Sequence, residues 1–241
     1  RVQDPLLILE VERRGGDTPH TVLTFANASG RLPSAPFWLE DQPKIAGLAP
    51  GDVAQVIGEV ALYRGQRQLK VSSIRPLPKG AVDLSLLVPS IGDPGPYWKT
   101  LDGWRAEIAR PRLAATLDLF YRDDDFRQRY EACPASLAGH HALLGGLLKH
   151  TVEVASIARA IARACRAEMD LVLAGVLLHD IGKLDAYRWD GGIFEMTEAG
   201  TLHGHVVLGA LMVDRAVRAA VPAPCTGQEL AILQHLVLSH H

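Results

Sequence analysis

The chain has 241 residues, of which 48% are hydrophobic and 22% charged, a profile that excludes fibrous, disordered and membrane-spanning chains. Its 25 Lys and Arg residues nearly balance 27 Asp and Glu residues. The net charge of -2 therefore excludes the broad cationic surface of a charge-driven nucleic-acid binder, although it leaves room for a local basic groove.

The cysteines indicate the cellular compartment. There are three of them, an odd number without a CxxC pair, which argues against a disulfide framework and against a thiolate zinc site. No run of 18 apolar residues and no basic-then-apolar leader is present. We expect a cytoplasmic protein with no membrane contact. The chain starts at Arg1 rather than Met and stops after an apolar helical stretch, so both ends are expected to be trimmed.

Residues 1–80 are predicted to form strands. Apolar residues recur with a period of two, and turn residues such as Pro50-Gly51-Asp52 and Arg64-Gly65 interrupt them. Five short strands at this spacing predict a small closed barrel. The expected strands cover residues 6–9, 21–25, 37–39, 53–63 and 66–74.

After residue 80 the pattern changes. Residues 81–97 are rich in Pro, Gly and Asp and predict a linker, and a helical period begins beyond it. A hairpin is expected at 187–196. The sequence thus predicts an α+β multidomain protein, in which an all-α domain over 98–241 with a small hairpin insertion follows the barrel. Helices are expected over 97–121 with a break at Pro111, and over 143–165, 171–181, 205–220 and 227–240.

One helix carries an unusual pair of residues. His179 and Asp180 follow a nearly continuous apolar run that starts at Leu171, and an unpaired carboxylate is costly to bury. The pair could simply cap a helix end and face solvent. However, nine of the ten histidines lie between residues 140 and 241, several of them beside apolar runs. Imidazoles and a carboxylate supplied by four separate helices favour a divalent-metal site inside a helical bundle.

The sequence motifs around these histidines resemble those of a known family. The lone His followed by His-Asp is the signature of HD-domain metal-dependent phosphohydrolases, and the local motifs resemble the YhaM-type 3′→5′ exoribonucleases. That family joins an N-terminal OB-fold to an HD domain, and the resemblance covers nearly the whole chain. The motifs that carry it are His140-His141-Ala142, Gly145 through Thr151, His179-Asp180-Ile181-Gly182-Lys183, Gly204-His205, Leu238 through His241, Pro50 through Val53 and Tyr63 through Lys70.

The resemblance implies two metal ions. It assigns a first ion to His150, His179 and Asp180, with Asp180 able to bridge, and a second ion to three further histidines. Mn²⁺ is expected ahead of Mg²⁺, Co²⁺, Fe²⁺ or Zn²⁺. The last signature Asp has no match before the chain ends and is expected beyond it, which leaves the number of ions open. The histidines of the second ion are His205, His240 and His241.

Other residues are expected to contact the substrate or assist the reaction. Lys183, one turn after Asp180, would reach a phosphate oxygen, or else serve only as a cation at a helix C-terminus. His140 and His141 could bind phosphate or assist proton transfer, with a structural role equally open. His203 lies two positions from His205, about 200° around a helix, and is not expected to share its metal.

In the barrel, exposed aromatic residues would stack on single-stranded bases while neighbouring cations contact phosphates. Phe25 could do so but is more often a core residue, and one of Phe37 and Trp38 must point inward. Near-neutral charge predicts modest, salt-sensitive affinity and suggests a homo-oligomer that pools several barrels. The candidate contacts are Trp38, Tyr63, Arg64, Arg67 and Lys70.

Three functions follow from these features. The first is a metal-dependent 3′→5′ exonuclease that hydrolyses single-stranded RNA to nucleoside monophosphates, with DNA left open as a second substrate. The second is an HD phosphohydrolase that acts on nucleotides or cyclic dinucleotides, which the adjacent His240-His241 pair also suits. The third is a non-catalytic single-strand-binding protein with a structural metal. We favour the first, because the histidine cluster is joined to a barrel.

Overall fold

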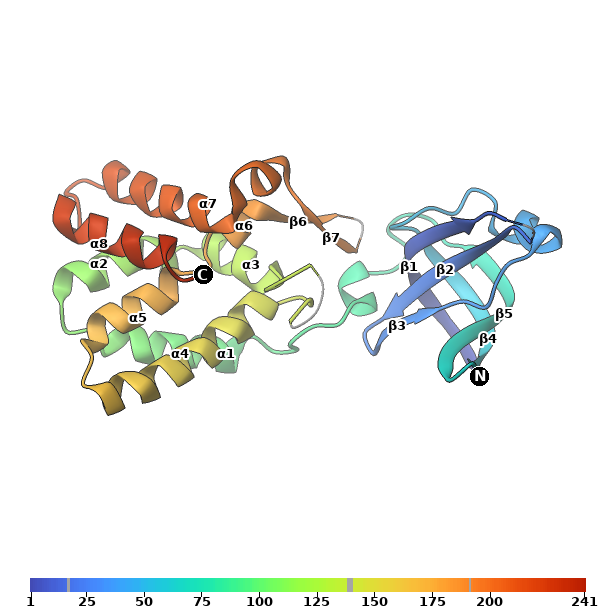
Figure 1. Ribbon diagram of the computed structural model, residues 1–241, viewed down its shortest axis with the longest axis horizontal. Helices are drawn as coiled ribbons and strands as arrows, with labels where there is room; N and C mark the ends of the chain where they lie inside the picture. The colour runs from blue at the N-terminus through green and yellow to red at the C-terminus, as the bar shows by residue number, and fades with distance from the viewer. Residues whose placement is uncertain (17, 138–140, 191) are drawn as a thin grey trace. The chain divides into compact units, whose positions relative to one another are not determined.

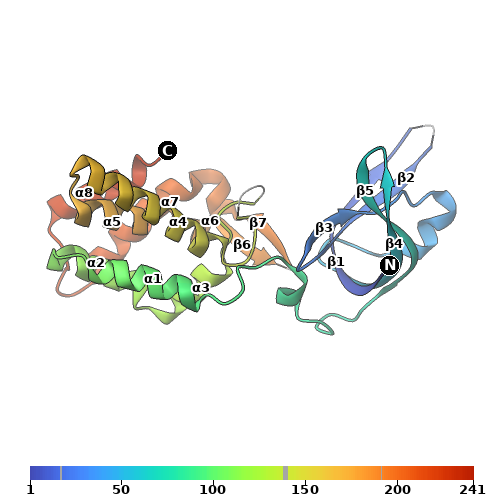
Figure 2. The same ribbon diagram turned by 90° about the horizontal axis from the view of Figure 1, so that it is seen from below.

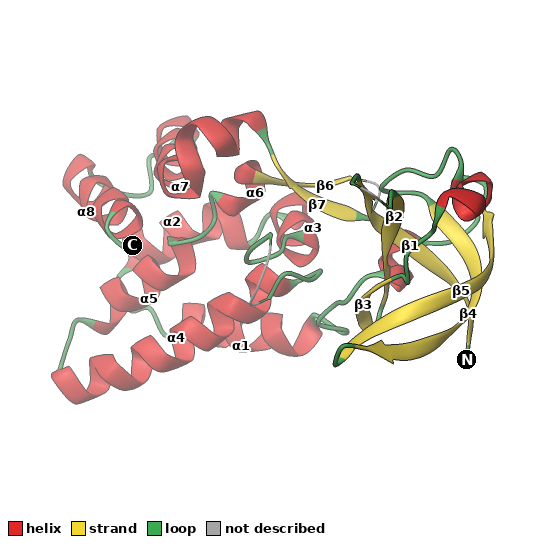
Figure 3. Ribbon diagram, turned by 45° about the vertical axis from the view of Figure 1, so that its right-hand side comes forward, coloured by secondary structure: helices red, strands yellow, loops and turns green. Residues whose placement is uncertain are grey.

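The computed structural model describes residues 1–16, 18–137, 141–190 and 192–241. The chain divides into two compact units: residues 1–90 with 189–193, and residues 91–188 with 194–241. Strands make up most of the regular structure of the first unit, and helices that of the second (Figure 3).

The N-terminal unit contains a five-stranded antiparallel sheet. Its strand order is β3-β2-β1-β4-β5, and β4 and β5 form a long hairpin around Arg64-Gly65 (Figure 1). Beyond the ladders, Ser34 forms an isolated parallel bridge with Leu69, whose carbonyl accepts a 2.8 Å hydrogen bond from the N–H of Ala35. The strands are β1 (Val2–Arg14), β2 (His20–Asn27), β3 (Gly30–Pro33), β4 (Val53–Tyr63) and β5 (Gln66–Pro76).

The expected strand at residues 37–39 is wrong. The third strand is instead β3, which a tight turn at Gly30 (φ 137°) returns directly against β2. Pro36 has no N–H to donate to a ladder. Phe37 accordingly makes only one bridge, to Thr21, before the 3₁₀ helix η1 (Leu39–Ile45) begins. A second 3₁₀ helix, η2 (Leu84–Leu87), follows β5.

The second unit is helical, with a small hairpin (Figure 2). The expected break at Pro111 and the expected hairpin are confirmed. Helix α3, which was not expected, forms from a charged segment whose start is capped by Asp123, because its carboxylate accepts the N–H of Phe126. The elements are α1 (Gly95–Ala106), α2 (Pro111–Tyr121), α3 (Asp124–Ala132), α4 (Gly146–Cys165), α5 (Met169–Leu178), α6 (Lys183–Ala186), β6 (Tyr187–Asp190), β7 (Ile193–Met196), α7 (Glu198–Ala219) and α8 (Gly227–Leu238).

Helix α5 lies in the core of this unit. Leu173, Ala174, Leu177 and Leu178 are buried, and α4 and α8 pack beside them. The hydroxyl of Tyr121 donates a 2.6 Å hydrogen bond to the carbonyl of Leu177, which fixes the end of α5 just before His179. Among the described residues, no helix combines the length and apolar character needed to cross a membrane.

Candidate metal centre

Four histidine side chains converge on the carboxylate of Asp180. This residue lies in the turn after α5 and is only 2% exposed. One carboxylate oxygen, Oδ2, lies 3.3 Å from Nε2 of His150 and 3.1 Å from Nε2 of His179. The other oxygen, Oδ1, lies 3.3 Å from Nε2 of His205 and 3.6 Å from Nε2 of His240. The C-terminal ends of α5 and α8, the N-terminal part of α4 and the kinked part of α7 therefore meet at one anion.

In the neutral form of two of these histidines, the nitrogen that faces Asp180 carries no proton. Nδ1 of His179 donates a 2.6 Å hydrogen bond to the carbonyl of Val176, and Nδ1 of His240 donates one of the same length to the carbonyl of Val237. In a neutral imidazole the other nitrogen is then an acceptor. Nε2 of each ring thus presents a lone pair to a carboxylate, which is itself an acceptor.

A cation between these imidazole and carboxylate lone pairs would remove their mutual repulsion. Among the described residues, Oδ1 of Asp180 and Nε2 of His240 are buried and have no hydrogen-bond partner, and such groups are costly unless something binds them. Nε2 of His179 lies 3.4 Å from Nε2 of His150, a further pair of potential ligands. The donor set of imidazole nitrogens and one carboxylate suits a first-row divalent metal.

The potential ligands fall into two groups of three, within each of which the ligand atoms lie within 4.8 Å of one another. Nε2 of His205 and Nε2 of His241 are 3.0 Å apart in the second group. Oδ1 of Asp180 lies beside that group and Oδ2 beside the first, so this carboxylate could bridge two ions. The groups are His150, His179 and Asp180, and His205, His240 and His241.

Two glycines allow this convergence. Gly182 packs so closely against α7 that a Cβ there would lie 1.9 Å from the carbonyl oxygen of His205 and 2.3 Å from the backbone nitrogen of Gly209. Gly204 has a φ of 71° and a ψ of 157°, which kinks α7. Because of this kink, His205 turns toward Asp180 while His203 stays exposed. Glycine is the residue that adopts such a positive φ with little conformational strain.

Lys183 binds the same carboxylate. Its Nζ donates a 2.6 Å hydrogen bond to Oδ2 of Asp180, and both side chains are buried. Burial raises the pKa of Asp180, but without a metal ion, hydrogen bonds from protonated imidazoles of His150, His179 and others outweigh it and hold the pKa well below its ordinary value. The interaction with Asp180 in turn raises the pKa of His240, although burial opposes the shift.

A cavity of about 640 Å³ opens beside the cluster. Five of the potential ligands and Lys183 line it together with several apolar residues. A volume of this size accommodates a small ligand next to the candidate metal positions. The apolar lining residues are Val154, Leu171, Val172, Val176 and Leu236.

The remaining histidines differ in position. His140 lies outside the described residues. His141 has a left-handed φ of 58°, and its Nε2 lies 2.8 Å from Oε2 of Glu153; its ring centre is 6.1 Å from that of His150. His203 and His235 are exposed. Glu153 therefore holds His141 near the first group, a contact that 12 residues of separation concealed in the sequence.

The N-terminal unit has a groove of about 510 Å³ that brings together Trp38, Tyr63, Arg64 and Arg67. We call it the aromatic groove. Trp38 is 40% exposed and Tyr63 57% exposed, and the guanidinium of Arg64 lies 5.4 Å from the centre of the Tyr63 ring. Lys70 is exposed but does not line the groove.

His20 also lines the aromatic groove, and sequence reasoning missed it. Its ring centre lies 4.9 Å from that of Trp38. No local pattern pointed to it, because His20 opens β2 whereas Trp38 follows β3. None of the described residues lining the groove is acidic.

Comparison with known proteins supports the resemblance seen in the motifs. The HD domain family model matches residues 147–241, which contain all the potential metal ligands described above. The protein named 3′-5′ exoribonuclease YhaM in Bacillus subtilis (strain 168) is 29% identical over 99% of this chain and 76% of its own length. The protein of that name in Shouchella clausii (strain KSM-K16) is 31% identical over 84% of this chain and 65% of its own length. No solved structure matches the chain significantly. The resemblance to this family is confirmed, and the C-terminal half is an HD domain.

Proposed function

We propose that this HD-domain protein is a metal-dependent 3′→5′ exonuclease that hydrolyses single-stranded RNA to nucleoside monophosphates. The observation that carries the proposal is the set of imidazoles around Asp180, four of whose nitrogens lie within 3.6 Å of one buried carboxylate. The similarity to exoribonucleases along 99% of the chain supplies the reaction and its direction.

The proposed ligands form two metal positions. His150, His179 and Asp180 would hold the first ion, and a second group of histidines would hold the other, with Asp180 between them. Divalent ions at these positions supply an activated water nucleophile and positive charge that offsets the charge developing on the phosphodiester. We propose Mn²⁺ as the native metal, ahead of Mg²⁺, Co²⁺, Fe²⁺ and Zn²⁺, on the basis of the resemblance. The second group is His205, His240 and His241.

The protein's own side chains prepare this site. Lys183 is held at 2.6 Å from Asp180 and lines the cavity, so we propose that it orients the carboxylate and adds positive charge near a phosphate oxygen. His141, fixed by Glu153, would contact the substrate phosphate or transfer a proton. His140 is proposed to assist it on the basis of the resemblance alone.

We propose that residues 1–80 form an OB-fold barrel that binds the RNA, joined through residues 81–97 to the catalytic domain over 98–241. The bridge between Ser34 and Leu69, which links the chain after β3 to β5, supports closure of the sheet. The aromatic groove would hold the strand through base stacking on Trp38 and Tyr63 and phosphate contacts from Arg64 and Arg67. Lys70 would add a more distant phosphate contact.

Two wider expectations belong to the same proposal. All three cysteines are described, and their thiols are free, which supports a cytoplasmic location, where RNA is also found. The near-neutral charge of the chain supports a homo-oligomer in which several RNA-binding units share one strand. Analytical ultracentrifugation, in which a monomer would contradict that expectation, tests the oligomer.

The decisive experiment follows a 5′-labelled RNA oligonucleotide incubated with Mn²⁺. Stepwise shortening from the 3′ end by the wild type, absent in Asp180→Asn, would support the proposal. A DNA strand of the same sequence shows whether the sugar matters. Nucleotides and a cyclic dinucleotide serve as competing substrates: if they are hydrolysed while the oligonucleotide stays intact, the site acts on small molecules. Tight RNA binding without turnover would indicate a structural metal.

A further inference from the structure

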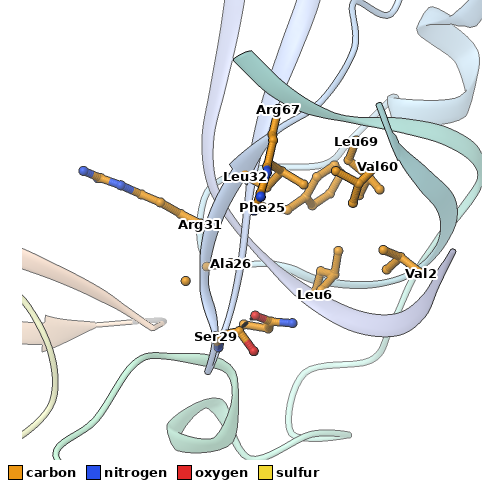
Figure 4. A pocket seen from close by; sticks show the side chains of 12 residues that line it. Val2, Leu6, Phe25, Ala26, Ser29, Arg31, Leu32, Val60, Arg67 and Leu69 are labelled. Atoms are coloured by element: carbon orange, nitrogen blue, oxygen red, sulfur yellow. Dashed lines mark hydrogen bonds between the residues drawn. The ribbon is translucent and has the colours of Figure 1, made fainter. Parts of the chain in front are cut away.

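The N-terminal unit has a second depression, of about 290 Å³, which is lined in part by Phe25 (Figure 4). We call it the Phe25 hollow. All five strands contribute to it: Leu6 and Leu69 are buried at its base, and Val60, which is 48% exposed, lies at its rim. Most of the side chains that line the hollow are therefore apolar.

Arg67 supplies positive charge to the hollow. In Figure 4 its guanidinium reaches down beside Leu32 and Phe25, whereas Arg31 points away. None of the described residues that line the hollow is acidic, and the same holds for the aromatic groove, so Arg67 has no carboxylate partner in either depression. An arginine beside an apolar floor suits a ligand with a flat apolar part and an anionic part.

The hollow and the aromatic groove are neighbours that share this arginine. Along β3 and the residue after it, Gly30 to Leu32 line the hollow, and Pro33 and Ser34 line the groove. Along β5, Arg67 lines both, Leu69 the hollow and Gln68 the groove. The two depressions therefore adjoin at Arg67.

We infer that the Phe25 hollow is a second base subsite for single-stranded nucleic acid, with Arg67 clamping the phosphate that joins it to the base in the aromatic groove. This inference rests on the proposed function, whose substrate it describes further. A base would cover the partly exposed Leu32 and the exposed Val60 and gain burial there, while its phosphate meets the one cation common to both depressions. The hollow offers mainly apolar contacts, so binding would depend little on which base occupies it.

The test measures binding of a labelled ten-residue RNA, and of DNA of the same sequence, to the full chain without divalent metal, so that the strand stays intact. Val60→Glu places a carboxylate at the exposed rim and is expected to weaken binding about fivefold or more, because a base loses its apolar contact with Val60 and the added charge repels the phosphate. Leu86→Glu is the matched control, because Leu86 is 68% exposed in the same unit but lines neither depression.

The salt dependence separates a phosphate clamp from a structural role. Arg67→Gln should reduce the slope of log affinity against log salt by about 0.7, the value for one phosphate contact on a single strand. Arg75→Gln, on the exposed part of the same strand and outside both depressions, should leave the slope unchanged. Equal binding by the Val60 and Leu86 variants, or an unchanged slope for the Arg67 variant, overturns the inference.

These outcomes are independent of the proposed function. If the wild type shortens RNA but the Val60 variant binds it normally, the hollow is not a subsite and the exonuclease proposal stands. If the wild type shortens nothing while both binding effects occur, the subsite stands and the exonuclease proposal fails. An effect on RNA alone would mean that the 2′-hydroxyl contributes to recognition.

Discussion

Replacing Gly182 with alanine sets two physical effects against each other. Gly182 has a helical backbone (φ -64°, ψ -13°), so alanine is unstrained there and by propensity alone would stabilise the protein by about 0.5–1 kcal/mol. However, the new methyl group would lie 1.9 Å from the carbonyl oxygen of His205, 2.3 Å from the backbone nitrogen of Gly209 and 2.8 Å from its Cα. All three neighbours are backbone atoms of α7, which cannot rotate away as a side chain can.

The distance between residue 182 and α7 must therefore increase by roughly 1.5 Å to reach ordinary van der Waals contact. Overpacking of this kind lowers the free energy of unfolding by about 1–3 kcal/mol. Because His205 is on the part of α7 that must retreat, its Nε2 would leave Asp180, now 3.3 Å away, and His241, now 3.0 Å away. We expect lower stability, loss of the second metal ion, and a fall in exonuclease activity of about a hundredfold, the usual effect of a 1 Å misplacement in an active site.

Urea denaturation, metal content after gel filtration and the RNA-shortening assay measure these three effects. Gly103→Ala is the matched control, because Gly103 is an exposed residue inside α1, and a Cβ added there would have no atom within 4 Å. It should be neutral or slightly stabilising. If Gly182→Ala is as stable as the control and keeps both metal and activity, the close approach of α7 is not what holds the site together.

The remaining predictions concern metal binding and the support of the site. Adding Mn²⁺ at about 100 times its Kd should stabilise the wild type by about 2.7 kcal/mol in thermal denaturation, whereas Asp180→Asn should show no such gain; equal shifts would mean that the ion binds elsewhere. His205→Ala should lower metal affinity at least about tenfold, whereas His203→Ala should leave it unchanged, because His203 is exposed. Isothermal titration compares the two variants, and equal losses would contradict the view that the kink at Gly204 directs His205 alone toward the metal. Tyr121→Phe removes the hydrogen bond to the carbonyl of Leu177 and should cost about 1 kcal/mol in urea denaturation, while an unchanged midpoint would show that water replaces the hydroxyl.

Local patterns in the sequence were sufficient for most helices and strands. The period-two segments at 53–63 and 66–74 became β4 and β5, and the break at Pro111 separates α1 from α2. The predictions failed where local chemistry was ambiguous. Residues 37–39 look like a strand, but Pro36 and the turn at Gly30 place β3 earlier in the chain. Helix α3 was missed because its charged residues carry little apolar periodicity and its capping by Asp123 went unnoticed.

The site was predicted in composition but not in geometry. The clustering of histidines and the His-Asp pair indicated a metal site, and the family resemblance named six potential ligands, which the structure gathers into two adjoining groups. Resemblance, rather than periodicity, selected His205 over His203, and the kink at Gly204 gives the physical reason. The pairing of His141 with Glu153 and the tilted ring contact between His20 and Trp38 had no sequence signal, since each joins residues from different segments.

The sequence by itself determined which chemistry is present, because residue types and local periods are properties of neighbouring positions along the chain. It identified a helical segment that buries a carboxylate and the histidines able to compensate it. Only the tertiary structure decided that four imidazole nitrogens lie within 3.6 Å of the Asp180 carboxylate and that Lys183 donates a hydrogen bond to its Oδ2. It also decided that Arg67 lines two depressions at once. Such distances depend on how closely helices and strands approach one another, and contacts such as that of Gly182 with α7 set them.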